Sequence, residues 1–230
     1  MPISVEQFAN RSLASEAAAR YVAAAIRRNL VESKNTSFVV SGGSTPEQCY
    51  KVLAETDLEW ERVYVLPGDE RYVPADHDAS NEKMIRRLLV TGRASAAQFV
   101  PMFDAALTPE ERCSELTDQL QSFPLPSAAS LLGIGEDGHF ASLFQDIDGT
   151  NEGLSQDSEL SCMVVRTAAS RYPRVTLTLS TLLQSDEIFL LFFGDAKRET
   201  FEKARHPGSE YPVSSLLLQQ RTPVRVIWAP

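Results

Sequence analysis

Short apolar segments of this chain run straight into loops rich in glycine and serine, and these loops lead into helical patterns. Residues 38–40 end in Ser41-Gly42-Gly43, and residues 129–134 end in Gly133-Ile134-Gly135. A strand whose consecutive residues are all apolar is covered on both faces, which is typical of parallel sheets with helices packed on either side. This pattern predicts an α/β fold with a mostly parallel sheet, in three layers, and helices on both faces.

Strand and helix patterns alternate along the whole chain. The first thirty residues have the spacing of a helix, with Val22, Ile26 and Leu30 on one face. Later helices are expected to start at capping residues or prolines; these starts are Thr45-Pro46, Ser80, Thr108-Pro109 and Asp195, and a last helix includes 216–218. Strands are expected at 38–40, 63–66, 129–134, 163–165, 175–179, 188–193 and 224–228, with a charged loop through Asp78 and an irregular segment at 146–159. Since no linker divides this pattern, residues 1–230 are expected to form a single domain.

Charge and cysteine content narrow the class of protein. The formal net charge is -9, and an acidic surface repels nucleic acid phosphates and anionic lipid, so we expect no nucleic-acid partner and no membrane partner. No apolar run reaches the roughly 20 residues of a membrane span, and the N-terminus has no basic head before an apolar core. The cysteines Cys49, Cys113 and Cys162 are odd in number and lack CxxC spacing, which speaks against a disulfide framework or a zinc ribbon. These features predict a cytoplasmic protein.

The first loop of interest is Ser41-Gly42-Gly43-Ser44-Thr45-Pro46, which joins a strand to a helix start. In sheets of this kind, ligands bind beyond the carboxyl ends of the strands. Gly42 and Gly43 let the backbone approach a ligand closely, while Ser44 and Thr45 add hydroxyl donors beside free helix N–H groups. The loop is either a phosphate cradle or a tight turn before an ordinary helix cap. It is neither a P-loop nor a dinucleotide GxGxxG motif.

A second loop, Gly68-Asp69-Glu70-Arg71, follows the next predicted strand. Arg71 can hold a phosphate or an oxyanion through two hydrogen bonds, and Asp69 can orient an imidazole or a water. The alternative is a solvated surface cluster of ion pairs.

A third loop, Gly135-Glu136-Asp137-Gly138-His139, contains one of the three histidines. Histidine titrates near neutral pH and is the commonest general base, although a lone histidine is often structural. All three loops follow predicted strands, so they are expected to converge at one edge of the sheet.

These segments together resemble the signature blocks of the 6-phosphogluconolactonase family. The blocks are SGGSTP, GDERYVP with His77 and Ser80-Asn81, and LGIGEDGHFASLF, followed by RVTLTL after Pro173 and by GDAK at 194–197, in the family's order across nearly the whole chain. The related glucosamine-6-phosphate deaminases carry NGH followed by Ile-Ala-Phe-Asn, whereas this chain has Asp137 and Ser142-Leu143-Phe144. Phe140 replaces the family's usual Thr and Gln145 its usual Pro, and neither change removes a candidate chemical group.

The resemblance implies a Rossmann-like fold and hydrolysis of 6-phospho-D-glucono-1,5-lactone to 6-phospho-D-gluconate, in the oxidative pentose phosphate pathway. It implies that His139 is the general base, that Asp69 orients His139 or the water, and that Arg71 clamps charge on the substrate. The remaining substrate and phosphate ligands are expected to be Gly42, Gly43, Ser44, Thr45, Asp137, Gly138, Arg174 and Lys197. Since no G-x-S-x-G elbow is present, direct attack by water is preferred to an acyl-enzyme. No metal-ligand spacing is found, and the reaction needs no cofactor.

Two other functions are compatible with the same residues. One is an isomerase and deaminase of amino-sugar phosphates, and the other is a non-catalytic sugar-phosphate sensor. The sensor predicts a fused DNA-binding helix-turn-helix, whereas here the N-terminal helix leads directly into the first strand. The sequence leaves the oligomeric state open between a monomer and a weak dimer.

Overall fold

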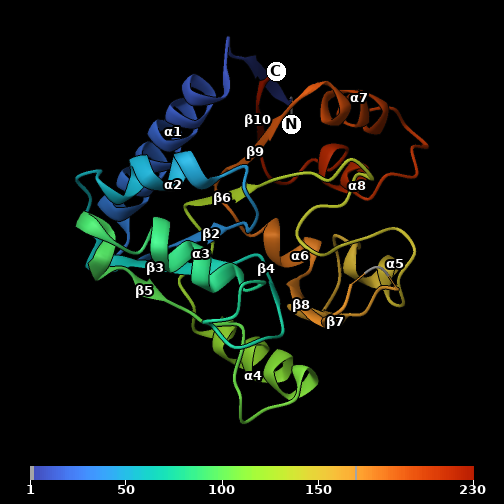
Figure 1. Cartoon of the computed structure of the whole chain (residues 1–230), viewed down its shortest axis with the longest axis horizontal. Helices are drawn as coiled ribbons and strands as arrows, with labels where there is room; N and C mark the ends of the chain where they lie inside the picture. The colour runs from blue at the N-terminus through green and yellow to red at the C-terminus, as the bar shows by residue number, and fades with distance from the viewer. Residues whose placement is uncertain (1–2, 169) are drawn as a thin grey trace.

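A seven-stranded sheet runs through the computed structural model, which describes residues 3–168 and 170–230 (Figure 1). Each neighbouring pair of its strands is parallel, in the order β1-β10-β9-β6-β2-β3-β5. The strands are β1 (Ser4–Gln7), β2 (Thr36–Val40), β3 (Val63–Pro67), β5 (Gln98–Phe99), β6 (Ala129–Leu132), β9 (Ile188–Phe193) and β10 (Val224–Ala229). The predicted parallel sheet is therefore confirmed.

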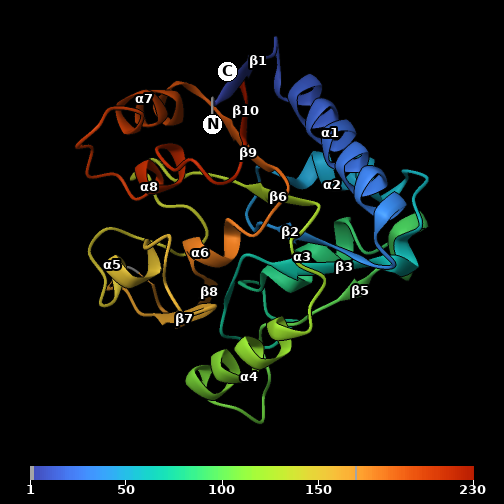
Figure 2. The same ribbon diagram turned by 180° about the vertical axis from the view of Figure 1, so that it is seen from behind.

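Consecutive residues of the strands pack on opposite faces of this sheet. Phe38 and Val40 contribute to one core, together with α1 (Arg11–Glu32), α2 (Glu47–Ala54) and α3 (Asn81–Leu88). Val39 contributes to the other core, together with α4 (Pro109–Gln121), α6 (Leu179–Leu182), α7 (Asp195–Ala204) and α8 (Val213–Leu217). Figure 2 shows α1 and α2 on one side of the sheet and α7 and α8 on the other. The three-layer α/β architecture predicted from the apolar segments is confirmed.

A second sheet of three antiparallel strands lies on the side of α4 and α6. Its order is β4 (Asp69–Arg71), β8 (Arg174–Leu177) and β7 (Cys162–Val165). The expectation that residues 68–78 form only a loop is wrong, because Asp69–Arg71 pairs with β8. The strands predicted at 163–165 and 175–179 belong to this second sheet and not to the parallel one, and the latter strand ends at Leu177, since Leu179 begins α6. No local signal distinguishes these strands from the parallel ones, since the distinction depends on their pairing partners.

Helix starts agree with the predictions where a side chain closes the first turn. The Thr108 hydroxyl accepts from the backbone N–H of Glu111, whose carboxylate accepts in return from the N–H of Thr108, so α4 has a full capping box. Ser80 caps α3 in the same way, by accepting from Lys83. Thr45 is not a helix cap, since α2 begins at Glu47 after Pro46, without a side-chain cap. Asp195 is the first residue of α7, and Gly194 precedes it as the cap.

Some short elements were not expected from the sequence. The first thirty residues are not all helical, because β1 precedes α1 and pairs with β10 at the sheet edge. The irregular segment contains α5 (Thr150–Gly153), and two short 3₁₀ helices occur at η1 (Trp60–Arg62) and η2 (Gly92–Ala96). None of the helices in the described ranges has the length and apolar character needed to cross a bilayer.

Two of the cysteines are paired. Cys113 on α4 and Cys162 on β7 form a disulfide, which the odd number of cysteines and their spacing did not predict. Cys49 is free and buried in α2, and burial raises the pKa of its thiol. A separation of 49 residues between the paired cysteines carries no spacing motif, and only the packing of α4 on β7 brings them together.

Candidate active site

A cavity of about 260 Å³ opens beyond the carboxyl ends of β2, β3 and β6. It is lined by Ser41, Gly42, Gly43, Ser44, Thr45, Pro46, Asp69, Arg71, Asn81, Gly133, Ile134, Gly135, His139, Ala141, Arg174 and Lys197. All three loops singled out in the sequence reach it, and β8 and α7 add a basic side chain each. The predicted convergence of the loops at one sheet edge is confirmed.

The 41–46 loop forms one wall of the cavity. Gly42 packs directly against the side chain of Asn81, where a Cβ atom would overlap the amide. Gly43 has φ +80°, a left-handed conformation that glycine adopts without steric cost. Because Thr45 does not cap α2, its hydroxyl and that of Ser44 are not committed to a helix cap. The loop therefore offers small polar groups to a ligand, as a phosphate cradle requires.

His139 is held by Asp137 on its own loop. The Asp137 Oδ1 and His139 Nδ1 atoms are 2.5 Å apart, and the His139 ring packs on Phe144 with centroids 4.5 Å apart. Burial on its own raises the pKa of Asp137, but the hydrogen bond and charge of His139 outweigh it and lower the pKa below its usual value. An ionised carboxylate only accepts, so Nδ1 carries a proton, and in the neutral form of the imidazole Nε2 then has a lone pair. The geometry suits a general base.

Gly135 makes this arrangement possible. A Cβ atom at this position would overlap both the His139 ring and the Asp137 carboxylate. The backbone N–H of Gly135 donates to the carbonyl of His139 at 2.8 Å, which closes the loop beneath the pair. Gly135 therefore leaves the space that the histidine–carboxylate pair occupies.

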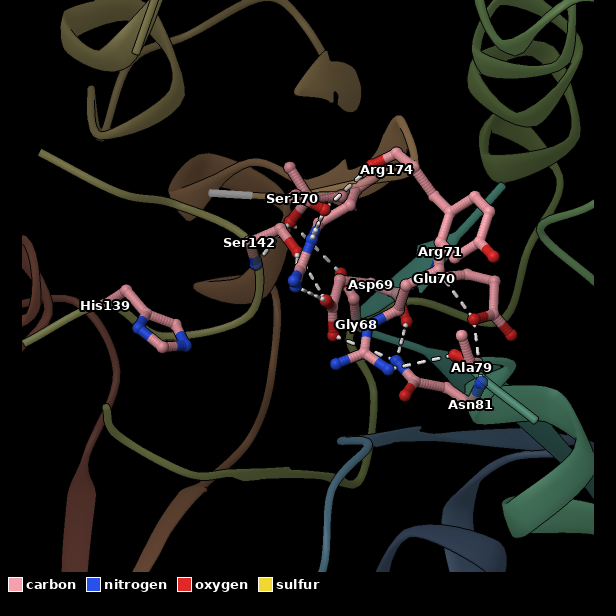
Figure 3. Close-up of polar contacts among 12 residues, drawn as sticks. Gly68, Asp69, Glu70, Arg71, Ala79, Asn81, His139, Ser142, Ser170 and Arg174 are labelled. Carbon is pink, nitrogen blue, oxygen red and sulfur yellow. Dashed lines mark hydrogen bonds and ion pairs between the residues drawn. The ribbon is translucent and has the colours of Figure 1, made fainter. Parts of the chain in front are cut away.

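Asp69 has different partners from those expected. Its carboxylate accepts from the Ser142 hydroxyl and lies 3.8 Å from Nη1 of Arg174, while Asn81 Nδ2 donates to its backbone carbonyl at 2.9 Å. Figure 3 shows Asp69, Ser142 and Arg174 facing one another, with His139 to one side of this cluster. The carboxylate that holds His139 is thus that of Asp137, and of the two roles predicted for Asp69 only the orientation of water is left.

Arg71 and Arg174 lie directly opposite each other on the antiparallel strands β4 and β8. Arg71 donates from Nη1 to the carbonyl of Ala79 at 2.9 Å, and its buried Nε has no hydrogen-bond partner in the described part of the chain. Like charges opposite each other repel. This arrangement differs from the solvated ion-pair cluster considered for Arg71, because the guanidinium lines the cavity.

The cavity is locally basic although the chain is acidic. Its charged lining residues are Arg71, Arg174 and Lys197 against the single carboxylate of Asp69. Burial lowers the pKa of Arg174, and the charge of Asp69 opposes this shift. Burial also lowers the pKa of Lys197, against the charge of Glu136. Desolvated cations bind an anion more strongly than surface cations do, so the cavity suits an anionic ligand.

Glu70 supports the site from beneath. It is fully buried, and its carboxylate accepts from the backbone N–H groups of Arg71, Asn81 and Glu82 at 2.7, 2.8 and 2.7 Å. Burial raises the pKa of Glu70 to about 7, although these N–H donors oppose the rise. The Glu70 side chain thus links β4 to the start of α3. Asp69 and Arg71, its two neighbours in β4, are held in place by this link.

The structure places the remaining predicted residues as follows. Gly42, Gly43, Ser44, Thr45, Arg174 and Lys197 line the cavity, whereas Asp137 and Gly138 do not. Phe140 is buried in the core and Gln145 is exposed, so both departures from the family pattern lie outside the cavity. No role was predicted from the sequence for Asn81, Ser142 or Glu70. All three stand in quoted blocks, but their contacts join distant segments and carry no local signal.

No group of three or more His, Cys, Asp or Glu side chains suited to a metal ion is found in residues 3–168 and 170–230.

Comparisons with known proteins show the family to which the chain is related. Residues 9–228 match the family model described as glucosamine-6-phosphate isomerases/6-phosphogluconolactonase. The chain is 35% identical to 6-phosphogluconolactonase of Mesorhizobium japonicum, covering 97% of this chain and 94% of the relative. It is 34% identical to the enzyme of the same name from Caulobacter vibrioides, covering 99% and 98%. A crystal structure of a 6-phosphogluconolactonase from Shewanella baltica superimposes with a TM-score of 0.94 at 30% identity, covering 100% of this chain and 98% of the other.

Proposed function

The chain belongs to the family of glucosamine-6-phosphate isomerases and 6-phosphogluconolactonases, and we propose that it hydrolyses 6-phospho-D-glucono-1,5-lactone to 6-phospho-D-gluconate. Relatives that match nearly the whole chain carry the lactonase name, and so does the structure of TM-score 0.94. The observation that carries the proposal is a histidine with Nδ1 held by a carboxylate, in a cavity with three basic side chains. In this proposal, 6-phospho-D-gluconate forms in the cavity, as a step of the oxidative pentose phosphate pathway.

The proposed reaction is direct hydrolysis by water. Nε2 of His139 takes a proton from water as the oxygen bonds to the lactone carbonyl carbon, which gives a tetrahedral oxyanion. Arg71 stabilises the charge that develops on that oxygen. When the bond from this carbon to the ring oxygen breaks, the imidazolium returns its proton to the ring oxygen. The product is a hydroxyl and a carboxylic acid, which ionises. Asp69 is assigned to orient the attacking water.

The substrate phosphate is assigned to Ser44 and Thr45 together with Arg174 and Lys197. These groups come from three separate segments and line one cavity. We expect a crystal grown with sulfate or 6-phosphogluconate to place an anion within hydrogen-bond distance of at least two of them. An anion bound elsewhere, with all four side chains directed to solvent, would refute the assignment.

A lactonase assay on the purified protein tests the function. The expected result is a rate of hydrolysis well above that of spontaneous lactone opening. The rate is monitored by acid release or by a coupled assay that oxidises the product. The rival deaminase activity predicts ammonia release from glucosamine 6-phosphate, and the sensor predicts binding of sugar phosphates without turnover. Ammonia release with no excess lactone hydrolysis, or binding alone, would overturn the proposal.

The same proposal includes the cellular location and the domain organisation of the enzyme. We place the protein in the cytoplasm, with residues 1–230 acting as one domain on a small phosphosugar lactone. Direct attack by water asks for no cofactor.

A further inference from the structure

Ser142 joins two charged residues of the site. It is fully buried, its hydroxyl donates to Oδ2 of Asp69, and Nη1 of Arg174 donates to the same hydroxyl at 3.2 Å (Figure 3). The Arg174 and Asp69 atoms are themselves 3.8 Å apart, beyond a hydrogen bond. The hydroxyl therefore fills the gap between guanidinium and carboxylate and bonds to both.

The backbone fixes where this hydroxyl lies. Ala141, which lines the cavity, has φ 48°, a conformation that is uncommon for residues other than glycine. The backbone N–H of Ser142 donates to the Thr176 hydroxyl at 3.1 Å, which ties the loop to β8, the strand that carries Arg174. Ser142 is thus held by the backbone of Ala141, which borders the cavity, and by Thr176 on β8.

Arg174 needs such a support. Arg71 lies opposite it on β4 and repels it. Among the described residues, the Arg174 side chain has, besides Ser142, the ion pair with Asp69 at 3.8 Å and a 3.3 Å hydrogen bond from Nε to Ser170. The guanidinium also lies over the Phe144 ring, 5.4 Å from its centroid, which does not determine its rotation. The Ser142 hydroxyl is the contact that directs Nη1 toward Asp69.

We propose that Ser142 is a positioning residue for substrate binding, whose hydroxyl holds Arg174 against Asp69 so that the guanidinium meets the substrate phosphate. The inference rests on the proposed function and deepens it. Because a phosphate contact is the same in the bound substrate and in the transition state, its loss raises KM and leaves kcat unchanged.

The test is Ser142→Ala in the full-length protein, with Ser37→Ala as the matched control. Ser37 is equally buried and its hydroxyl also has two partners, Pro124 and Ser127, in β2 away from the cavity. Losing a hydrogen bond to charged groups should raise the lactone KM of Ser142→Ala roughly tenfold, with kcat within about a factor of two. Ser37→Ala should leave both constants near wild type.

A double-mutant cycle separates positioning from a general effect on the fold. In an Arg174→Ala background, Ser142→Ala should add no further change in KM, because the residue it positions is absent. A KM of Ser142→Ala equal to that of Ser37→Ala, or a full additional effect without Arg174, overturns the inference while the proposed function stands. A loss confined to kcat also overturns it, since the hydroxyl would then act at the reacting end.

Two measurements keep the test decisive. If Ser142→Ala does not fold, Ser142→Cys, which is a smaller change than alanine, takes its place. Its KM is expected to lie between those of the wild type and of Ser142→Ala. Calorimetric titration with 6-phosphogluconate should show weaker binding to the Ser142 variants, independently of turnover. A wild type that binds this product without hydrolysing the lactone would refute the proposed function alone, and equal affinity of wild type and variant would refute the role of Ser142.

Discussion

Replacing His139 with alanine is expected to lower the lactonase kcat on the order of 100-fold or more while the protein stays folded. His139 lines the cavity, and its Nδ1 is held 2.5 Å from the Asp137 carboxylate, so Nε2 is the atom free to take the proton of water. Without the imidazole, water must attack as a neutral nucleophile. The measurement is kcat on the lactone, corrected for spontaneous opening, with folding checked by thermal melt.

The matched control is His206→Ala, a histidine on an exposed loop outside this cavity. Its kcat should equal that of the wild type. Asp137→Asn should also lower kcat, because the amide no longer favours the charged imidazole that forms during attack. Near-normal turnover in a folded His139→Ala variant would end the assignment of His139 as the base.

Replacing Arg71 with alanine is expected to cost roughly 2–4 kcal/mol of transition-state stabilisation, or on the order of 30- to 1,000-fold in kcat/KM. The side chain lines the cavity, which places its charge where a substrate oxygen can bind. An exposed ion pair would contribute only about 0–1 kcal/mol. Arg71→Lys should recover part of the loss, because an ammonium cannot reproduce the planar two-pronged contact.

Arg93→Ala serves as the control for Arg71, since Arg93 forms an exposed ion pair with Asp57, 2.9 Å apart. Its kcat/KM should stay at the wild-type value. If wild type, Arg71→Ala and Arg71→Lys differ by less than about fivefold, under 1 kcal/mol, Arg71 does not belong to the site.

Local signals were sufficient for much of the fold. The apolar run at 38–40 indicated a strand buried on both faces, and Phe38 and Val40 indeed face one core while Val39 faces the other. Thr108-Pro109 with Glu111 marked a helix start because all the atoms of a capping box lie within four residues. Thr45 carried a similar signal and did not cap α2. There α2 begins at Glu47, directly after Pro46 and without a side-chain cap, and Thr45 lines the cavity instead.

The sequence by itself determined that the chain forms a three-layer α/β sheet and that three polar loops meet at its carboxyl edge, because burial and loop position depend on neighbours along the chain. Only the tertiary structure decided how the charged groups pair. Arg71 and Arg174 lie opposite each other although they are more than a hundred residues apart in the sequence. The Ser142 hydroxyl donates to Asp69, and Cys113 forms a disulfide with Cys162. Asp137, rather than Asp69, holds His139. Each of these pairings depends on register and distance between segments that are remote in the chain, and residue types alone do not specify either quantity.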